Sequence, residues 1–231
     1  MVDAVNLRDK VDIVNVPWSL TMMTETTKDR LVTAASQLLD LGGIDAVTLR
    51  GVAERVGVSH NAPYKHFDDR SALLAAVAER DFVKLRDTFD HALDQGSEPV
   101  IALRAALGAF IGYGLQHPAR YRLLFSDPSL PSDGALKEKA FASFTAFLRI
   151  VETCQRVGSL PTGDPIRLSG LIYAAVHGAI DLEIGGRANG EKGLANVADT
   201  VGLLLRLLAP GSSYSDMDSH IMLQKSPSPG G

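Results

Sequence analysis

The sequence has little that would suit a secreted, zinc-binding or membrane-spanning protein. Its 231 residues include one cysteine, Cys154, so no disulfide can form within the chain and no Cys-x-x-Cys pair offers zinc ligands. The longest stretch without a charged side chain, residues 105–119, is shorter than the ~20 apolar residues that a spanning helix needs. These absences exclude a transmembrane protein and indicate a reducing cytoplasm as the location.

An excess of positive charge is also missing. The chain carries 23 Lys or Arg against 27 Asp or Glu, a net charge of −4, so contacts with nucleic acid would have to come from locally placed cations. Composition alone therefore argues mildly against a DNA-binding protein. The six histidines are scattered without a His-Glu-x-x-His pattern, and no Gly-rich phosphate loop is present, so neither a metal nor a cofactor is expected.

The two ends of the chain differ in composition from its middle. Residues 1–23 make a poor signal peptide, and we interpret them as a disordered arm or as sequence upstream of a start at Met22 or Met23. Residues 210–231 hold 12 Gly, Pro or Ser, which leaves too few apolar groups to offset the entropy of ordering them. We expect this tail to be disordered as well.

Between the ends, apolar residues repeat with helical spacing, and no window alternates as a strand does. Helix starts are predicted at N-cap residues, namely Thr26 or Thr27, Thr48, Ser59, Asp68 or Asp69, and Asp164 followed by Pro165. The fold class that follows is all-α. Residues 24–80 form an N-terminal helix-turn-helix head of three to four helices, and residues 81–209 form a C-terminal antiparallel helical bundle.

One segment carries a functional pattern. Residues 48–67 read TLRGVAERVGVSHNAPYKHF, which predicts a short capped helix, a tight turn at Gly57 and a second short helix. Two helices joined in this way form the helix-turn-helix unit, whose second helix enters the major groove of DNA. Pro63 lacks a backbone donor and disfavours a helical residue before it, so this second helix should begin irregularly. A helix hairpin in an ordinary bundle is the alternative interpretation.

The residues that follow make the match specific. Residues 28–82 resemble the DNA-binding head of the TetR family of bacterial repressors, through the motifs Thr48, Val52-Ala53, Gly57-Val58-Ser59, Tyr64, His66-Phe67, Arg70 and Leu73-Leu74. The family usually has Gly near position 61 and Lys near position 70. The resemblance implies a homodimeric repressor that binds DNA until a small molecule binds its second half. It also implies that residues 60–66 form the recognition helix.

Elementary chemistry gives the candidate DNA contacts their roles. Caps at helix N-termini favour a phosphate, cations reach the DNA backbone, and Asn or Ala in the first turn of a recognition helix can meet adenine or the thymine methyl. The candidates are Thr48, Arg50, Ser59, His60, Asn61, Ala62, Tyr64, Lys65, His66 and Arg70. Each has a structural alternative as a plain cap, a solvated charge or a packing residue. Residues 24–80 contain seven Lys or Arg and eight Asp or Glu, so binding should be strongly salt-sensitive and not promiscuous.

The second half resembles the TetR-family C-terminal domain named after its Trp, His and Gly motif, with Tyr173 in place of the Trp. Aromatic and aliphatic side chains could wall an apolar ligand cavity there, although packing in the core is the alternative for each. The candidates are Phe110, Tyr113, Phe144, Phe147, Leu148, Tyr173 and His177. The resemblance assigns helices at residues 165–184 and 191–209 to the interface of a homodimer.

Two other classes of function compete with a regulator. An enzyme is suggested by residues 57–61, which nearly copy the Gly-x-Ser-x-Gly nucleophile elbow, but the last Gly is missing and a helix, not a strand, precedes the segment. A helical adaptor that has lost DNA binding is supported by the net acidic head. The cations at Lys65, His66 and Arg70 argue against it. The sequence therefore predicts a ligand-responsive transcriptional regulator with a double-stranded DNA operator and a small-molecule effector as partners.

Overall fold

A computed structural model describes residues 25–128, 130, 134–193 and 196–209, and the predicted terminal arms lie outside these residues. The described chain consists of α-helices, short 3-10 turns and loops, and it contains no strand, which confirms the all-α prediction. It divides into two compact units, Met1–Ile150 and Val151–Gly231.

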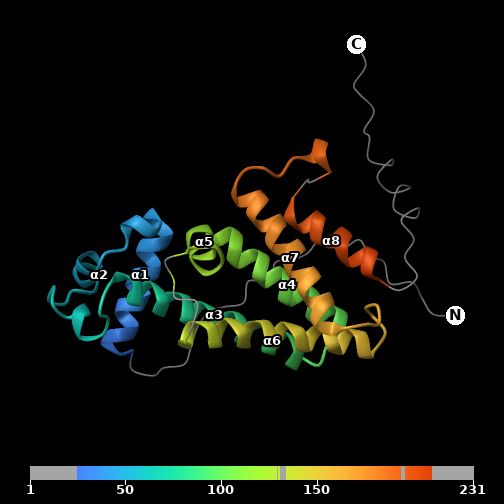
Figure 1. Ribbon diagram of the computed structural model, residues 1–231, viewed down its shortest axis with the longest axis horizontal. Helices are drawn as coiled ribbons and strands as arrows, with labels where there is room; N and C mark the ends of the chain where they lie inside the picture. Colours follow the sequence, from blue (N-terminus) through green and yellow to red (C-terminus); the bar gives the residue numbers. More distant parts are fainter. Residues whose placement is uncertain (1–24, 129, 131–133, 194–195, 210–231) are drawn as a thin grey trace, which may run out of the picture. The chain divides into compact units, whose positions relative to one another are not determined.

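The first unit begins with the predicted head, drawn in blue and teal in Figure 1. It contains α1 (Thr27–Gly42), the 3-10 turn η1 (Ile44–Ala46), α2 (Leu49–Val56), the 3-10 turn η2 (Pro63–Lys65) and the start of α3 (Arg70–Asp94). Caps fix the helix starts, as predicted. The Thr26 hydroxyl accepts from the Asp29 amide in a capping box, and Thr48 and Asp69 cap α2 and α3.

The hydrophobic core of the head includes a residue from beyond the head. Its buried members come mainly from α1, α2 and the first turns of α3, but Leu123 of α5 (Pro118–Ser126) belongs to the same cluster and is 2% exposed. The predicted boundary at residue 80 also falls inside α3, which is continuous across it. The head is thus joined to the rest of the first unit by a continuous helix and by a shared core.

The remainder of the first unit is an aromatic core between α3, α4 (Pro99–Gln116), α5 and the part of α6 (Gly134–Arg156) before residue 151. Phe110 contacts Phe89 and Phe125, with ring centroids 6.4 and 5.7 Å apart, and Phe147 lies 5.9 Å from Phe89. Among the described residues, α4 alone is long and apolar enough to cross a membrane, with a mean hydropathy of 1.2. Since its buried face packs in this core, we interpret it as a core helix.

The second unit contains the end of α6, then α7 (Pro165–Ile184), the turn η3 (Gly190–Lys192) and α8 (Val197–Leu208), and α7 packs against α8. Asp164 caps α7 ahead of Pro165, as predicted. The last helix is shorter than predicted, because it begins at residue 197 and not near 191. Asn196 caps it, and the Glu183 carboxylate accepts the Val197 amide at 2.5 Å, so this side-chain pair fixes its start.

Candidate nucleic-acid interface

The turn after α2 has the geometry that the sequence predicts. Gly57 ends α2 in the left-handed conformation with φ 76° and ψ 34°, and its amide donates to the carbonyls of Ala53 and Glu54. The Val58 amide also donates to the Ala53 carbonyl, at 3.0 Å. These bonds satisfy the last carbonyls of α2 and reverse the chain, which brings the next residues out beside the helix.

The second helix is much shorter than predicted. The expected recognition helix over residues 60–66 is wrong in length, because η2 covers only Pro63–Lys65. Ser59 is not its cap: the N-cap is Ala62, which has no side-chain capping bond, and Ser59 accepts the Ala62 amide through its backbone carbonyl at 2.9 Å. The irregular start expected from Pro63 is confirmed. Ala62 nevertheless has helical angles, since the turn closed by Ser59 holds it there.

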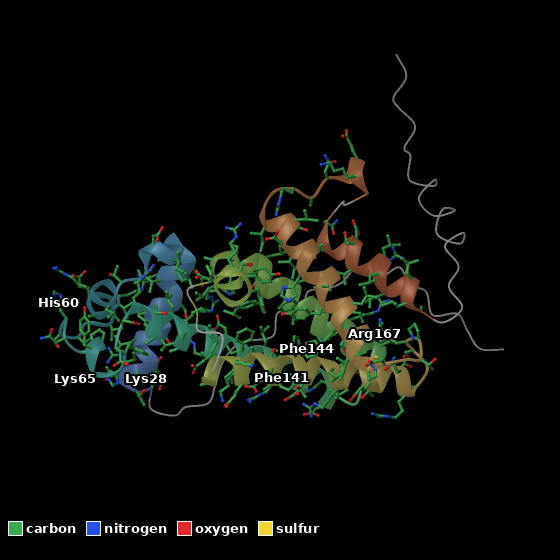
Figure 2. The ribbon with its side chains drawn as sticks, viewed as in Figure 1. Lys28, His60, Lys65, Phe141, Phe144 and Arg167 are labelled. Carbon is green, nitrogen blue, oxygen red and sulfur yellow. The ribbon has the colours of Figure 1, made fainter. Side chains whose placement is uncertain are left out.

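Residues on this short segment divide between an inner and an outer side. Pro63 and Phe67 are buried, and Phe67 belongs to the head core with the Lys28 ammonium 5.8 Å from its ring centroid. The predicted contacts Ser59, His60, Asn61, Tyr64, Lys65 and His66 are exposed, while Ala62 is half-buried. Figure 2 shows His60 and Lys65 at the end of the head. The segment therefore presents polar, cationic and aromatic side chains outward from two apolar anchors.

At the N-terminus of α2, two more candidates are exposed, the cap Thr48 and Arg50 in the first turn. Thr48 accepts the Gly51 amide at 3.0 Å, so its hydroxyl already serves as a cap. Arg50 is paired with Glu54 at 3.1 Å, and His60 lies 3.6 Å from the same carboxylate. The Glu54 carboxylate therefore neutralises part of the positive charge of this surface, in agreement with the net acidic composition of the head.

Arg70 departs from its predicted role. It was expected to reach a phosphate, but its side chain is half-buried and its guanidinium donates to the backbone carbonyls of Val47, at 2.7 Å, and Ile44. Two of the three guanidinium nitrogens, Nε and Nη2, are thus directed into the head. Sequence reasoning could not detect this, because the acceptors are main-chain atoms more than 20 residues away.

A buried polar cluster joins the head to α4 and α5, and sequence reasoning missed it. Asp81 on α3 is completely buried; it accepts from the Tyr113 hydroxyl at 2.9 Å and pairs with Arg120 at 3.1 Å. Arg120 also pairs with Asp40 on α1 at 3.1 Å, and the His117 ring lies 3.0 Å from Asp40. Burial and the Arg120 charge lower the pKa of His117, and burial, with the Asp81 charge, raises that of Tyr113.

A signal for Asp81 was present in the sequence. Residues 77, 78, 82 and 85 form the buried stripe of α3, and Asp81 stands at a position of that stripe where an apolar residue is expected. A carboxylate inside a helical stripe predicts a buried partner, because an unpaired buried charge is very costly.

The predicted ligand residues are divided between the two units. Phe110 and Phe147 are buried in the aromatic core, Phe144 and Leu148 are half-buried, and the hydroxyl of Tyr113 is committed to Asp81. In the second unit, Tyr173 is exposed and its ring centroid lies 3.9 Å from that of His177.

An open hollow at the surface of the second unit includes none of these candidates. It has a volume of about 350 Å³ and is lined by Glu152, Gln155, Arg156, Thr162 and Gly163. Within the described ranges, no group of three or more His, Cys, Asp or Glu side chains is arranged to hold a metal ion.

Comparison with known families gives matches in both halves of the chain. A family model described as "Bacterial regulatory proteins, tetR family" matches residues 31–77. A second, described as "Tetracyclin repressor-like, C-terminal domain", matches residues 103–208. The first match spans α2, Gly57 and η2, which form the candidate interface.

Individual relatives agree with these matches. The class A tetracycline repressor of transposon 1721 from Escherichia coli is 44% identical over 57 residues, 25% of this chain and 26% of its own length. The transcriptional activator FasR of Mycolicibacterium smegmatis is 32% identical over 101 residues, 43% of this chain and 46% of its own. The chain therefore spans less than half of the length of these curated relatives.

A solved structure matches over a longer range. A protein of unknown function from Rhodococcus sp. RHA1 is 32% identical, with a TM-score of 0.68, and the match covers 80% of this chain and 96% of that one.

Proposed function

Because the chain belongs to the TetR family of transcriptional regulators, whose members bind DNA and are not enzymes, we propose that it binds a palindromic operator as a homodimer and is released by a small apolar molecule. The observation that carries this proposal is the segment of residues 59–66, in which all side chains but those of Ala62 and Pro63 are exposed. It projects an amide, an aromatic hydroxyl and cations from the end of the head, where a DNA groove can be reached.

Exposed apolar side chains on the last two helices support a dimer. Ile166 and Leu171 of α7 are 60% and 54% exposed, and Leu207 of α8 is 44% exposed. Large apolar side chains left in water on neighbouring helices favour pairing with a second copy. A twofold axis through that interface would give an operator of two half-sites about one DNA turn, ~34 Å, apart.

We propose that the protein represses transcription. Its proposed location is the cytoplasm. The relatives include both a repressor and an activator by name, so we would place the selected operator before a reporter gene. Lower reporter expression in the presence of the protein supports a repressor, and higher expression supports an activator. The effector is proposed to enter the helical bundle, where differential affinity for the released state would weaken DNA binding.

Selection from a random DNA pool, followed by fluorescence anisotropy, tests the proposal. We expect a palindromic consensus that binds more tightly than a random-sequence duplex. Replacing Lys65 with Ala should weaken binding to both duplexes. It should also reduce the salt slope, the slope of log affinity against log salt concentration, by about the contribution of one phosphate contact. Lys137→Ala on α6 removes the same charge from an exposed position outside the head and should leave binding unchanged. A protein that enriches no sequence and ignores every duplex at low salt would instead be the helical adaptor.

Asn61 is expected to read a base. Its exposed amide can pair with both adenine acceptor and donor positions in the major groove, a contact that discriminates by about 1–3 kcal/mol. Asn61→Ala should therefore relax the preference at one position of each half-site while affinity for random DNA is retained. Repeating the selection with this variant measures that effect, and an unchanged consensus would remove Asn61 from the base contacts.

A further inference from the structure

The guanidinium of Arg70 lies in a place that the DNA-binding role does not explain. Arg70 is the first residue of α3, directly after the Asp69 cap, and its side chain turns back to the chain between α1 and α2. There Nε donates to the Val47 carbonyl at 2.7 Å and Nη2 donates to the Ile44 carbonyl. These acceptors precede Arg70 by 23 and 26 residues, so the bonds connect two distant parts of the head.

The two carbonyls belong to the turn that leads into α2. η1 is a single 3-10 turn, whose internal bond joins the Val47 amide to the Ile44 carbonyl at 3.2 Å. The next residue, Thr48, is the extended N-cap of α2. Val47 is completely buried, which leaves its carbonyl few routes to water. A side chain that holds these two carbonyls therefore also holds the N-terminus of α2 in its place within the head.

Arginine is suited to holding two acceptors together. Its guanidinium is planar, keeps its charge, and presents donors in a rigid fork. Lysine carries the same charge on a single ammonium at the end of a flexible stem, and it would hold this pair of carbonyls with a less defined geometry.

From this geometry we propose that Arg70 is a positioning residue for operator recognition, which acts by fixing the start of α2 against the start of α3 and does not bind a phosphate. The proposal rests on the proposed function. In the sequence, α2 and η2 lie between the carbonyls of residues 44 and 47 and Arg70. Fixing the starts of α2 and α3 against each other therefore defines where Arg50 and Asn61 lie. Sequence-specific contacts depend on that geometry, whereas general attraction to the DNA backbone depends mainly on charge.

Two variants separate positioning from a phosphate contact. Arg70→Lys keeps the charge and should lose about tenfold in affinity for the selected palindrome, the factor that corresponds to about 1.4 kcal/mol and to one charge-assisted hydrogen bond. Its affinity for a random-sequence duplex and its salt slope should stay those of the wild type. Arg70→Gln should lower still further the ratio of the affinity for the palindrome to the affinity for the random-sequence duplex. Lys65→Ala is the comparison variant, since it lowers binding to both duplexes and reduces the slope.

Controls keep the result interpretable. Circular dichroism at the assay temperature must show the variants folded, and hydrogen exchange should rise in Arg70→Lys over residues 44–53. Full binding by Arg70→Lys on both duplexes, or equal losses on both with a smaller salt slope in Arg70→Gln, would overturn the inference and restore a phosphate contact. Wild-type protein that binds neither duplex would refute the proposed function itself, and the positioning role with it.

Discussion

At the scale of single residues, Asp81 shows how one charged side chain can fix the arrangement of several helices. Its carboxylate is 0% exposed and is held by Tyr113 and Arg120. Buried ion pairs add little net stability, because desolvation opposes the attraction, but removal of one partner leaves the other charge buried and unpaired. The Asp81 cluster therefore favours one arrangement of α3, α4 and α5 over alternatives in which the charges separate.

Loss of the Asp81 carboxylate should therefore destabilise the protein. Asp81→Asn should lower the free energy of unfolding by about 3 kcal/mol, because the buried Arg120 charge loses its fully buried anion and keeps only the partly exposed carboxylate of Asp40. Asp87→Asn on the same helix is the matched control: Asp87 is paired with Arg86 at 2.6 Å, but its side chain is 58% exposed, so the loss should stay below about 1 kcal/mol. Urea unfolding followed by circular dichroism measures both. Equal losses would contradict the role assigned to burial.

His177 gives a prediction on acid stability. Burial lowers its pKa to about 4, whereas the pKa of histidine in an unfolded chain is about 6.5. The unfolded chain therefore binds the proton more readily, so this contribution to stability is complete above pH 6.5 and is lost as the pH falls towards 4. Thermal unfolding at pH 7.5 and pH 5 should show a larger loss in the wild type than in His177→Gln. An identical loss would place the acid sensitivity elsewhere.

At the scale of elements, the turn after α2 is set by one glycine. Gly57 has φ 76°, and apart from its own chain neighbours no described group lies within 4 Å of the point where a Cβ would stand, so an alanine there meets conformational strain but no clash with another part of the fold. Gly57→Ala should cost about 1 kcal/mol of stability. Gly112 lies inside α4, where Ala is the better helix former, so Gly112→Ala should stabilise by about 0.5–1 kcal/mol. Opposite shifts in melting temperature are expected, and shifts of the same sign would contradict this account.

The elements also show what the sequence can and cannot predict. Helix starts at Thr26, Thr48, Asp69 and Asp164 are predictable, since a cap acts on amides two or three residues away. The recognition helix is predicted too long, because several polar residues and a proline at its start favour a turn as much as a helix.

Contacts between distant residues are harder to predict. The Arg70 connection to Ile44 and Val47 depends on backbone acceptors whose positions follow only from the folded head. Asp81 could have been suspected from its place in an apolar stripe, but its partners on two other helices could not.

At the scale of the whole molecule, assembly should depend on the exposed apolar side chains of α7 and α8. Leu171→Asp on α7 should convert the proposed dimer to a monomer at micromolar concentration, because a carboxylate cannot be buried in an apolar interface without a partner. Operator affinity should fall with it, since both half-sites must be bound together. Leu41→Asp on α1, where Leu41 is 73% exposed, is the control for oligomeric state. Analytical ultracentrifugation decides the matter, and a Leu171→Asp dimer would move the interface away from α7.

The place of Leu123 in the head core has a consequence for engineering hybrid regulators. A fragment that ends near residue 80 would lack the side chain that fills part of its interior and would cut α3 in two. Transfer of this DNA-binding head to another ligand-binding domain would thus require α5 to be transferred with it, together with Asp40 and Asp81, the carboxylates that pair with Arg120. Recombination between relatives should be tolerated best where the exchanged segment includes both the head and α5.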